Sequence, residues 1–108
     1  MLSSALTRLA PGNLRAFTRV LQQDLMVLEP AIRLQQRFGE SLRWRSTGGV
    51  VLRIDRTGRL HARIAVTVAK NTDVRDAAAR VQDLARECLE RISHAPVGGV
   101  HVLISERP

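Results

Sequence analysis

The stretch TDVRDAAARVQDLARECLERISHAPVGGVHVLI, residues 72–104, decides the fold that we expect for this chain. It predicts one long amphipathic helix, a turn that contains glycine, and a strand in which apolar residues alternate. The apolar residues of the helical part recur every three or four positions, so they share one face of the helix. They are Val74, Ala77, Ala78, Val81, Leu84, Ala85, Cys88, Leu89 and Ile92. Such a face packs on a sheet and does no chemistry, so the stretch predicts a scaffold.

Capping residues mark the start of this helix. Thr72 or Asp73 can accept a hydrogen bond from the first free backbone N–H groups. On the outer face, two acidic residues each precede an arginine by four positions, a spacing that favours ion pairs along a helix. The pairs are Asp76 with Arg80 and Glu87 with Arg91.

A β-hairpin is predicted upstream of the long helix. Val50 to Asp55 and Arg59 to Ala69 have the composition of strands, and the short connection between them contains Gly58. Successive residues of a strand point to opposite faces of the sheet. In the second strand, one face holds Leu60, Ala62, Ile64, Val66 and Val68, and the other holds Arg59, His61, Arg63, Ala65 and Thr67. We therefore expect one core face and one face in contact with solvent.

Two helices are predicted before the hairpin. The first starts at Asn13, and its apolar residues keep helical spacing until Pro30, which ends helices because it lacks a backbone N–H. The second covers Ala31 to Leu42, and a loop follows from Trp44 to Gly49.

Together these elements predict an α+β fold. N-terminal helices precede a β-hairpin, a long amphipathic helix and a final strand, and the three strands form a mixed sheet with one face covered. A chain of 108 residues has room for one domain with one modest core. We expect a flexible N-terminus at residues 1–12 and a single α+β domain at 13–108, with a helical lead-in at 13–43 and a ββαβ core at 50–105.

The charge is strongly positive. The chain has 17 basic and 10 acidic residues, a formal net charge of +7, and every basic residue except Lys70 is arginine. Arginine makes paired hydrogen bonds to phosphates and carboxylates, although a GC-rich genome produces the same excess. Aromatic residues are few, which argues against single-stranded nucleic acid stacked on aromatic rings.

The sequence also bears on location. No apolar run is long enough to span a membrane, and the first residues do not have the pattern of a secretory signal. A single cysteine allows no internal disulfide, which is typical of the cytoplasm. Residues 1–23 contain three arginines and no acid, a composition that organellar transit peptides share.

Residues that could carry chemistry are scattered. Cys88 belongs to the apolar face of the long helix, where a buried, inert thiol is expected. His61 and His101 are predicted on the sheet face opposite the core, but no third metal ligand accompanies them, and His94 lies in a turn. Asp55 and Asp73 have structural positions at a hairpin and a helix cap. We therefore expect no catalytic residues, no metal and no cofactor.

One surface remains as a candidate for binding. Arg53, His61 and Arg63 are predicted on the sheet face away from the core, where their charge would attract phosphate or carboxylate groups. The alternative is that this face is simply solvated.

Three segments resemble the alkaline shock protein family of envelope stress response proteins. They are Leu25-Met26-Val27-Leu28-Glu29-Pro30, then Val66-Thr67-Val68 followed by the helix that opens at Thr72-Asp73-Val74 and runs through Val81-Gln82, Cys88 and Ile92, and then Pro96-Val97-Gly98-Gly99-Val100-His101-Val102. The resemblance covers about residues 25–105. It implies a non-enzymatic bacterial protein that forms homo-oligomers and is held near the membrane by a separate anchor protein. It implies no small-molecule substrate and a place in the cytoplasm, peripheral to the inner face of the membrane.

A second reading is a ribosome-associated RNA-binding protein similar to ribosome-binding factor A. The order helix, strand, strand, helix, strand and the basic surface are shared with that protein. Its KH-like core bends the long helix at a glycine or small-residue break, whereas residues 74–92 contain neither glycine nor proline. The uninterrupted helix favours the alkaline shock family over a KH-like domain that clamps nucleotides, but it does not argue against looser phosphate contacts.

Overall fold

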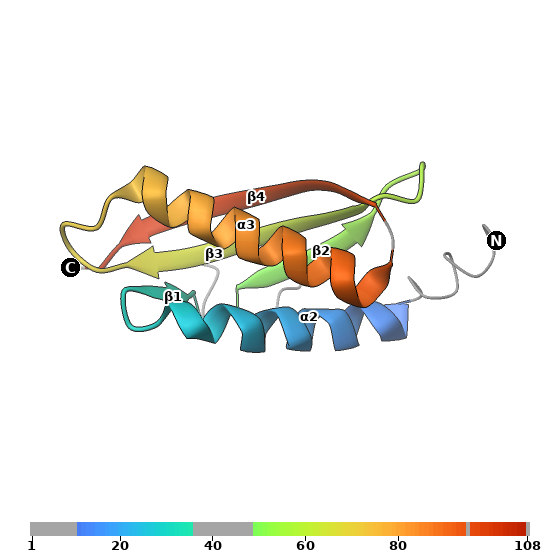
Figure 1. The fold of residues 1–108 in the computed structure, drawn as a ribbon, viewed down its shortest axis with the longest axis horizontal. Helices are drawn as coiled ribbons and strands as arrows, with labels where there is room; N and C mark the ends of the chain where they lie inside the picture. The colour runs from blue at the N-terminus through green and yellow to red at the C-terminus, as the bar shows by residue number, and fades with distance from the viewer. Residues whose placement is uncertain (1–10, 36–48, 95, 108) are drawn as a thin grey trace, which may run out of the picture.

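Two helices lie beside each other across one face of a four-stranded sheet (Figure 1). The computed structural model describes residues 11–35, 49–94 and 96–107. In chain order its elements are α2 (Pro11–Leu25), the 3-10 turn η1 (Met26–Leu28), β1 (Ile32–Leu34), β2 (Val50–Ile54), β3 (Leu60–Val68), α3 (Val74–Ser93) and β4 (Val97–Glu106). The predicted α+β class is confirmed.

β3 is the centre of the sheet. β1 and β2 both pair with it antiparallel on one side, and β4 pairs with it parallel on the other. Because a parallel pair needs a long crossover, α3 connects β3 to β4 and packs on the sheet. The mixed sheet and the hairpin of β2 and β3 are therefore as predicted.

β1 and β2 occupy the same position beside β3, one after the other. The N–H of Gln35 donates to the carbonyl of Ala65 at 2.8 Å, and the N–H of Ala65 donates to the carbonyl of Gly49 at 2.8 Å. The chain thus leaves the sheet after Gln35 and rejoins it at Gly49. Gly49 has a φ of +80°, and a Cβ there would lie 2.8 Å from the Ala65 oxygen. Only glycine fits where the two segments meet.

The structure corrects two predictions. The sheet has four strands, not three, because residues 32–34 form a strand that lies within the predicted helix of 31–42. After η1 and Pro30 the chain turns back along β3, where Ile32 is buried, Leu34 is half-buried and Arg33 is exposed. The spacing of Ile32 and Leu34 is compatible with a strand and with a helix. They form a strand because this segment pairs with the edge of β3. Residues 36–42 of that helix, residues 44–48 of the predicted Trp44 to Gly49 loop and residues 1–10 lie outside the described residues.

The core lies between the sheet and the two helices. The predicted core face of β3 is confirmed, since Leu60, Ala62, Ile64, Val66 and Val68 are all at most 1% exposed. Each buried Val, Leu or Ile side chain stabilises the fold by roughly 1.5–3 kcal/mol. The residues of α2 and α3 that complete this core are Leu21, Leu25, Ala77, Val81, Ala85, Cys88 and Leu89.

α3 is one uninterrupted helix of 20 residues. Asp73 is its N-cap, and its side chain accepts hydrogen bonds from the N–H groups of Arg75 at 2.9 Å and Asp76 at 3.2 Å. At the other end His94 takes the left-handed conformation, with φ +53°. Among the described residues, no helix combines the length and apolarity needed to cross a membrane.

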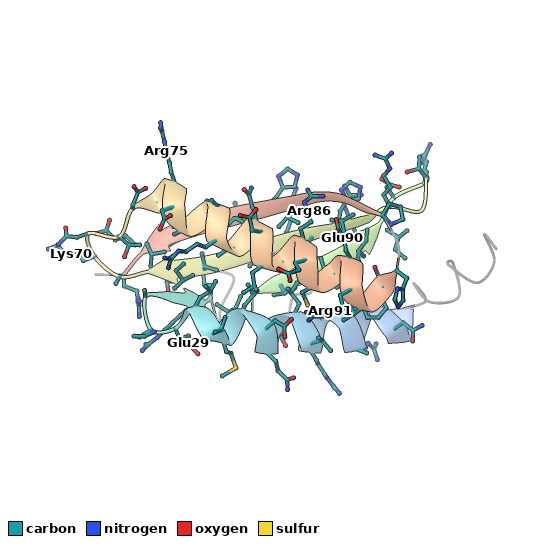
Figure 2. The ribbon with its side chains drawn as sticks, viewed as in Figure 1. Glu29, Lys70, Arg75, Arg86, Glu90 and Arg91 are labelled. Carbon is teal, nitrogen blue, oxygen red and sulfur yellow. The ribbon has the colours of Figure 1, made fainter. Side chains whose placement is uncertain are left out.

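An ion pair joins the two helices. Nη2 of Arg91 on α3 lies 2.8 Å from Oδ2 of Asp24 on α2, and Figure 2 shows Arg91 pointing from α3 towards α2. The predicted pair of Asp76 and Arg80 is present at 3.4 Å. Arg91 instead pairs with Asp24, 67 residues away in the sequence, and not with Glu87.

Candidate binding surface

The sheet face away from the two helices carries the predicted candidate residues. Strand register places Arg53 of β2 beside His61 of β3, and Arg63 of β3 between Val51 of β2 and His101 of β4. Paired residues in a sheet point to the same face. The structure therefore brings Arg53, His61, Arg63 and His101 together, and we call these four residues the basic sheet face.

A small hollow lies at the centre of the basic sheet face. Val51 and Ala62 line it together with the four residues, and its volume is about 40 Å³. That is little more than the roughly 30 Å³ that one water molecule occupies, and far below the roughly 300–1,000 Å³ of typical small-molecule sites. This face is suited to contact a flat partner surface or a single anionic group and not to enclose a metabolite.

His61 is held by Asp55 at the end of the hairpin. Nε2 of His61 lies 2.6 Å from Oδ2 of Asp55, and both side chains are about a quarter exposed. Oδ1 of Asp55 accepts hydrogen bonds from the Thr57 hydroxyl at 2.6 Å, the Thr57 N–H at 2.8 Å and the Arg59 N–H at 3.0 Å. The Thr57 hydroxyl, His61 and the Arg59 N–H hold the pKa of the Asp55 carboxyl well below its usual range. Asp55 is therefore an anion that orients the imidazole.

The His61 ring also lies against Gly98 of β4. A Cβ at Gly98 would be 2.5 Å from Cε1 and 2.6 Å from Nε2 of His61. The ring thus occupies the space that a side chain at position 98 would need. His61 is fixed between the hairpin and β4, so its first role is to join these elements.

Sequence reasoning missed this Asp55–His61–Gly98 arrangement. The available signal was the hairpin itself, because Asp55 and His61 lie six residues apart on either side of its short connection. Gly98 could not be found this way, because the parallel pairing of β4 with β3 depends on the packing of α3.

Groups that could do chemistry are not assembled elsewhere in the described residues. No three His, Cys, Asp or Glu side chains in them are close enough to hold a metal ion. Cys88 is buried, and burial, together with the neighbouring Asp24, raises the pKa of its thiol to about 12. The thiol is therefore protonated at neutral pH and is a poor nucleophile.

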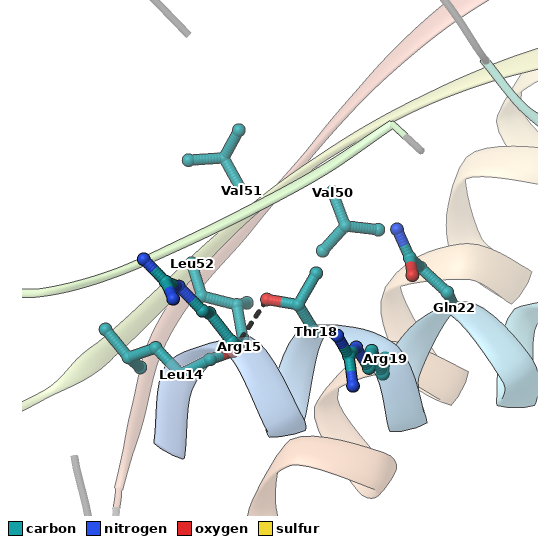
Figure 3. A pocket seen from close by; sticks show the side chains of 8 residues that line it. All are labelled: Leu14, Arg15, Thr18, Arg19, Gln22, Val50, Val51 and Leu52. Atoms are coloured by element: carbon teal, nitrogen blue, oxygen red, sulfur yellow. Dashed lines mark hydrogen bonds between the residues drawn. The ribbon is translucent and has the colours of Figure 1, made fainter. Parts of the chain in front are cut away.

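A larger groove, which the sequence did not predict, lies between α2 and β2 (Figure 3). Its volume is about 450 Å³. It is lined by Leu14, Arg15, Thr18, Arg19 and Gln22 of α2 and by Val50, Val51 and Leu52 of β2. The packing of α2 beside β2 places Arg15 and Arg19 along this groove.

Searches against protein-family models, curated proteins and solved structures each gave no match to this chain.

Proposed function

We propose that this chain is a non-enzymatic assembly domain that acts in envelope stress homeostasis. It associates with copies of itself and binds protein partners, with a membrane anchor protein holding it at the inner face of the membrane. One observation carries the proposal: both helices pack on the same face of the sheet, and the opposite face presents exposed Leu103 beside the basic sheet face. In such a contact Leu103 supplies an apolar centre and the basic sheet face supplies a polar surround.

Two further features support this proposal. Two of the three segments that resemble the alkaline shock family form one structural unit, the end of β3, α3 and β4. Exposed apolar side chains also occur at the η1 turn, where Met26 is 58% and Val27 is 74% exposed. Both lie in the Leu25 to Pro30 segment that carries the resemblance, so a second contact surface there fits an assembly domain.

The alternative function is that of a ribosome-associated RNA-binding protein. Arg33, Arg53 and Arg63 are exposed on strands of one sheet, with Arg33 beside Thr67 and Arg53 beside His61 on the face away from the helices. This is the charge pattern that phosphate contacts require. The unbroken α3 favours the assembly domain over a KH-like fold. In a KH-like fold the helix is interrupted and a loop clamps the nucleotides.

Light scattering after size exclusion tests the proposal. We expect oligomers whose mass rises with protein concentration. Because the basic sheet face repels its own copy, self-association through it should strengthen as salt screens the charges. A strict monomer that binds structured RNA, with an affinity that falls steeply with salt, would replace the assembly domain by the RNA-binding alternative.

A pull-down at native expression tests the partner. A membrane protein in the eluate supports an anchored assembly domain at the inner face of the membrane, and a ribosomal subunit supports the alternative.

A further inference from the structure

We propose that the groove between α2 and β2 binds an extended acidic segment of a partner protein, which joins the sheet as an additional strand beside β2. This groove is a different surface from the Leu103 side of the sheet, so the inference goes beyond the proposed function and does not require self-association.

The backbone of β2 provides the first reason. The N–H of Asp55 donates to the carbonyl of Arg59 at 2.9 Å, and the carbonyl of Gly49 accepts from Ala65 at 2.8 Å. In an antiparallel pair, residues that bond to the neighbouring strand alternate with residues whose N–H and C=O point away from it. The even residues of β2 therefore direct their backbone groups away from β3. They are Val50, Leu52 and Ile54.

The neighbours of this edge provide the second reason. Within the described residues, β3 is the only strand that pairs with β2. An unpaired strand edge is a template for an additional strand, and proteins use such edges to bind extended peptides. Side chains of the additional strand would lie in the groove, against its apolar lining. Val50 is 1% exposed, and Leu14 and Leu52 are half-buried.

The charge of the groove indicates that the bound segment is acidic. Arg15 and Arg19 are both exposed on the α2 side, and the described lining contains no acid. They lie four residues apart on α2, which is about 6 Å along the axis. Alternate residues of a strand are about 6.7 Å apart. A strand with acidic residues at alternate positions can therefore place one carboxylate near each guanidinium.

A second copy of this chain does not fit as the occupant. The occupant must be acidic to pair with Arg15 and Arg19, whereas this chain carries a net charge of +7. The described strands also lack the required pattern, since their only acidic residue is Glu106 at the end of β4. The partner is therefore a different protein with an acidic, extended segment.

Titration of the full chain with short peptides tests the inference. The probe is an eight-residue peptide of alternating valine and glutamate. One control peptide carries lysine in place of glutamate, and a second is methylated on every backbone nitrogen, which removes the N–H groups that would bond to β2. We expect binding of the probe alone, weakened about tenfold by R15A/R19A because two charge-assisted contacts are lost. The matched variant K70A/R75A removes the same charge from exposed positions far from the groove and should bind normally (Figure 2).

Amide hydrogen exchange identifies the surface used. On binding, the amides of Leu52 and Ile54 should gain protection, because they become bonded to the new strand. If the N-methylated peptide binds as well as the probe, or if protection appears only around Arg53 and Arg63, the inference is wrong. Tighter binding of single-stranded RNA than of the probe at the same groove would also overturn it. None of these results alters the oligomer mass, so they leave the assembly function to its own test.

Discussion

The imidazole of His61 is held with Nε2 2.6 Å from Oδ2 of Asp55, across the end of the hairpin of β2 and β3. The carboxylate that holds it is itself fixed by Thr57 and Arg59. The ring lies against Gly98, so one side chain joins the hairpin to β4. The geometry of the basic sheet face therefore depends on this pair.

Replacement of Gly98 by alanine should destabilise the protein. The new Cβ would lie 2.5 Å from Cε1 of His61, so the ring or β4 must move. We expect a loss of about 1–3 kcal/mol in the free energy of unfolding, as for other overpacked sites. Denaturant unfolding measures it.

Gly99 provides the matched control, because a Cβ there meets His61 only at 3.6 Å, an ordinary contact. The double variant H61A/G98A should recover part of the loss, since it removes the ring that clashes. Equal effects at positions 98 and 99, or no coupling to His61, would contradict this account.

Replacement of Asp55 by asparagine should change how stability depends on pH. The folded pKa of Asp55 lies below its unfolded value of about 3.8, so the carboxylate stabilises the fold above that pH. The contribution is lost as the pH falls below about 4 towards the folded pKa. D55N should therefore be less stable than the wild type at pH 7, and the two should converge in acid.

Unfolding curves between pH 7 and pH 2.5 measure this convergence. D83N is the control, because Asp83 is an exposed residue of α3, remote from the hairpin. A difference between wild type and D55N that stays constant with pH would show that the carboxylate charge is not the cause.

Two glycines with similar φ angles should respond differently to alanine. Gly49 has φ +80° and Gly58 has φ +83°, so both substitutions carry a conformational cost of about 1–2 kcal/mol. At Gly49 the Cβ would also lie 2.8 Å from the backbone oxygen of Ala65, whereas nothing lies within 4 Å at Gly58. G49A should cost at least about 3 kcal/mol, because the steric overlap adds to the conformational cost. Thermal and denaturant unfolding measure the stability of both variants. The prediction is wrong if G58A lowers the free energy of unfolding more than G49A does.

Replacement of Leu103 by aspartate should weaken self-association. Leu103 is 53% exposed on the sheet face away from the helices, so the change removes an apolar contact without disturbing the core. We expect the dissociation constant to rise about tenfold or more, as for a central interface residue. Sedimentation equilibrium measures it.

Val74 provides the control for this change. It is 49% exposed in the first turn of α3, so V74D adds the same charge outside the sheet. If V74D disrupts the oligomer and L103D does not, the contact surface lies on the helical side and not on the sheet face.

The local elements follow from the sequence because short-range patterns determine them. The apolar stripe of α3, its Asp73 cap and the alternation of β3 are properties of neighbouring residues, and each predicted core position of β3 is buried. The alternation also placed Arg53, His61 and Arg63 on one face, since side-chain direction in a strand has a period of two. What that face binds stays a prediction.

Only the tertiary structure decided how distant segments meet. Residues 32–34 are compatible with a helix or a strand, and the free edge of β3 makes them a strand. Arg91 has Glu87 within reach on its own helix, yet the packing of α2 offers Asp24. The contact of His61 with Gly98 and the groove between α2 and β2 join residues that no local pattern connects. The sequence therefore determined most of the local elements and which of their faces are apolar. Where a residue or segment had two possible partners, tertiary packing determined which one it contacts.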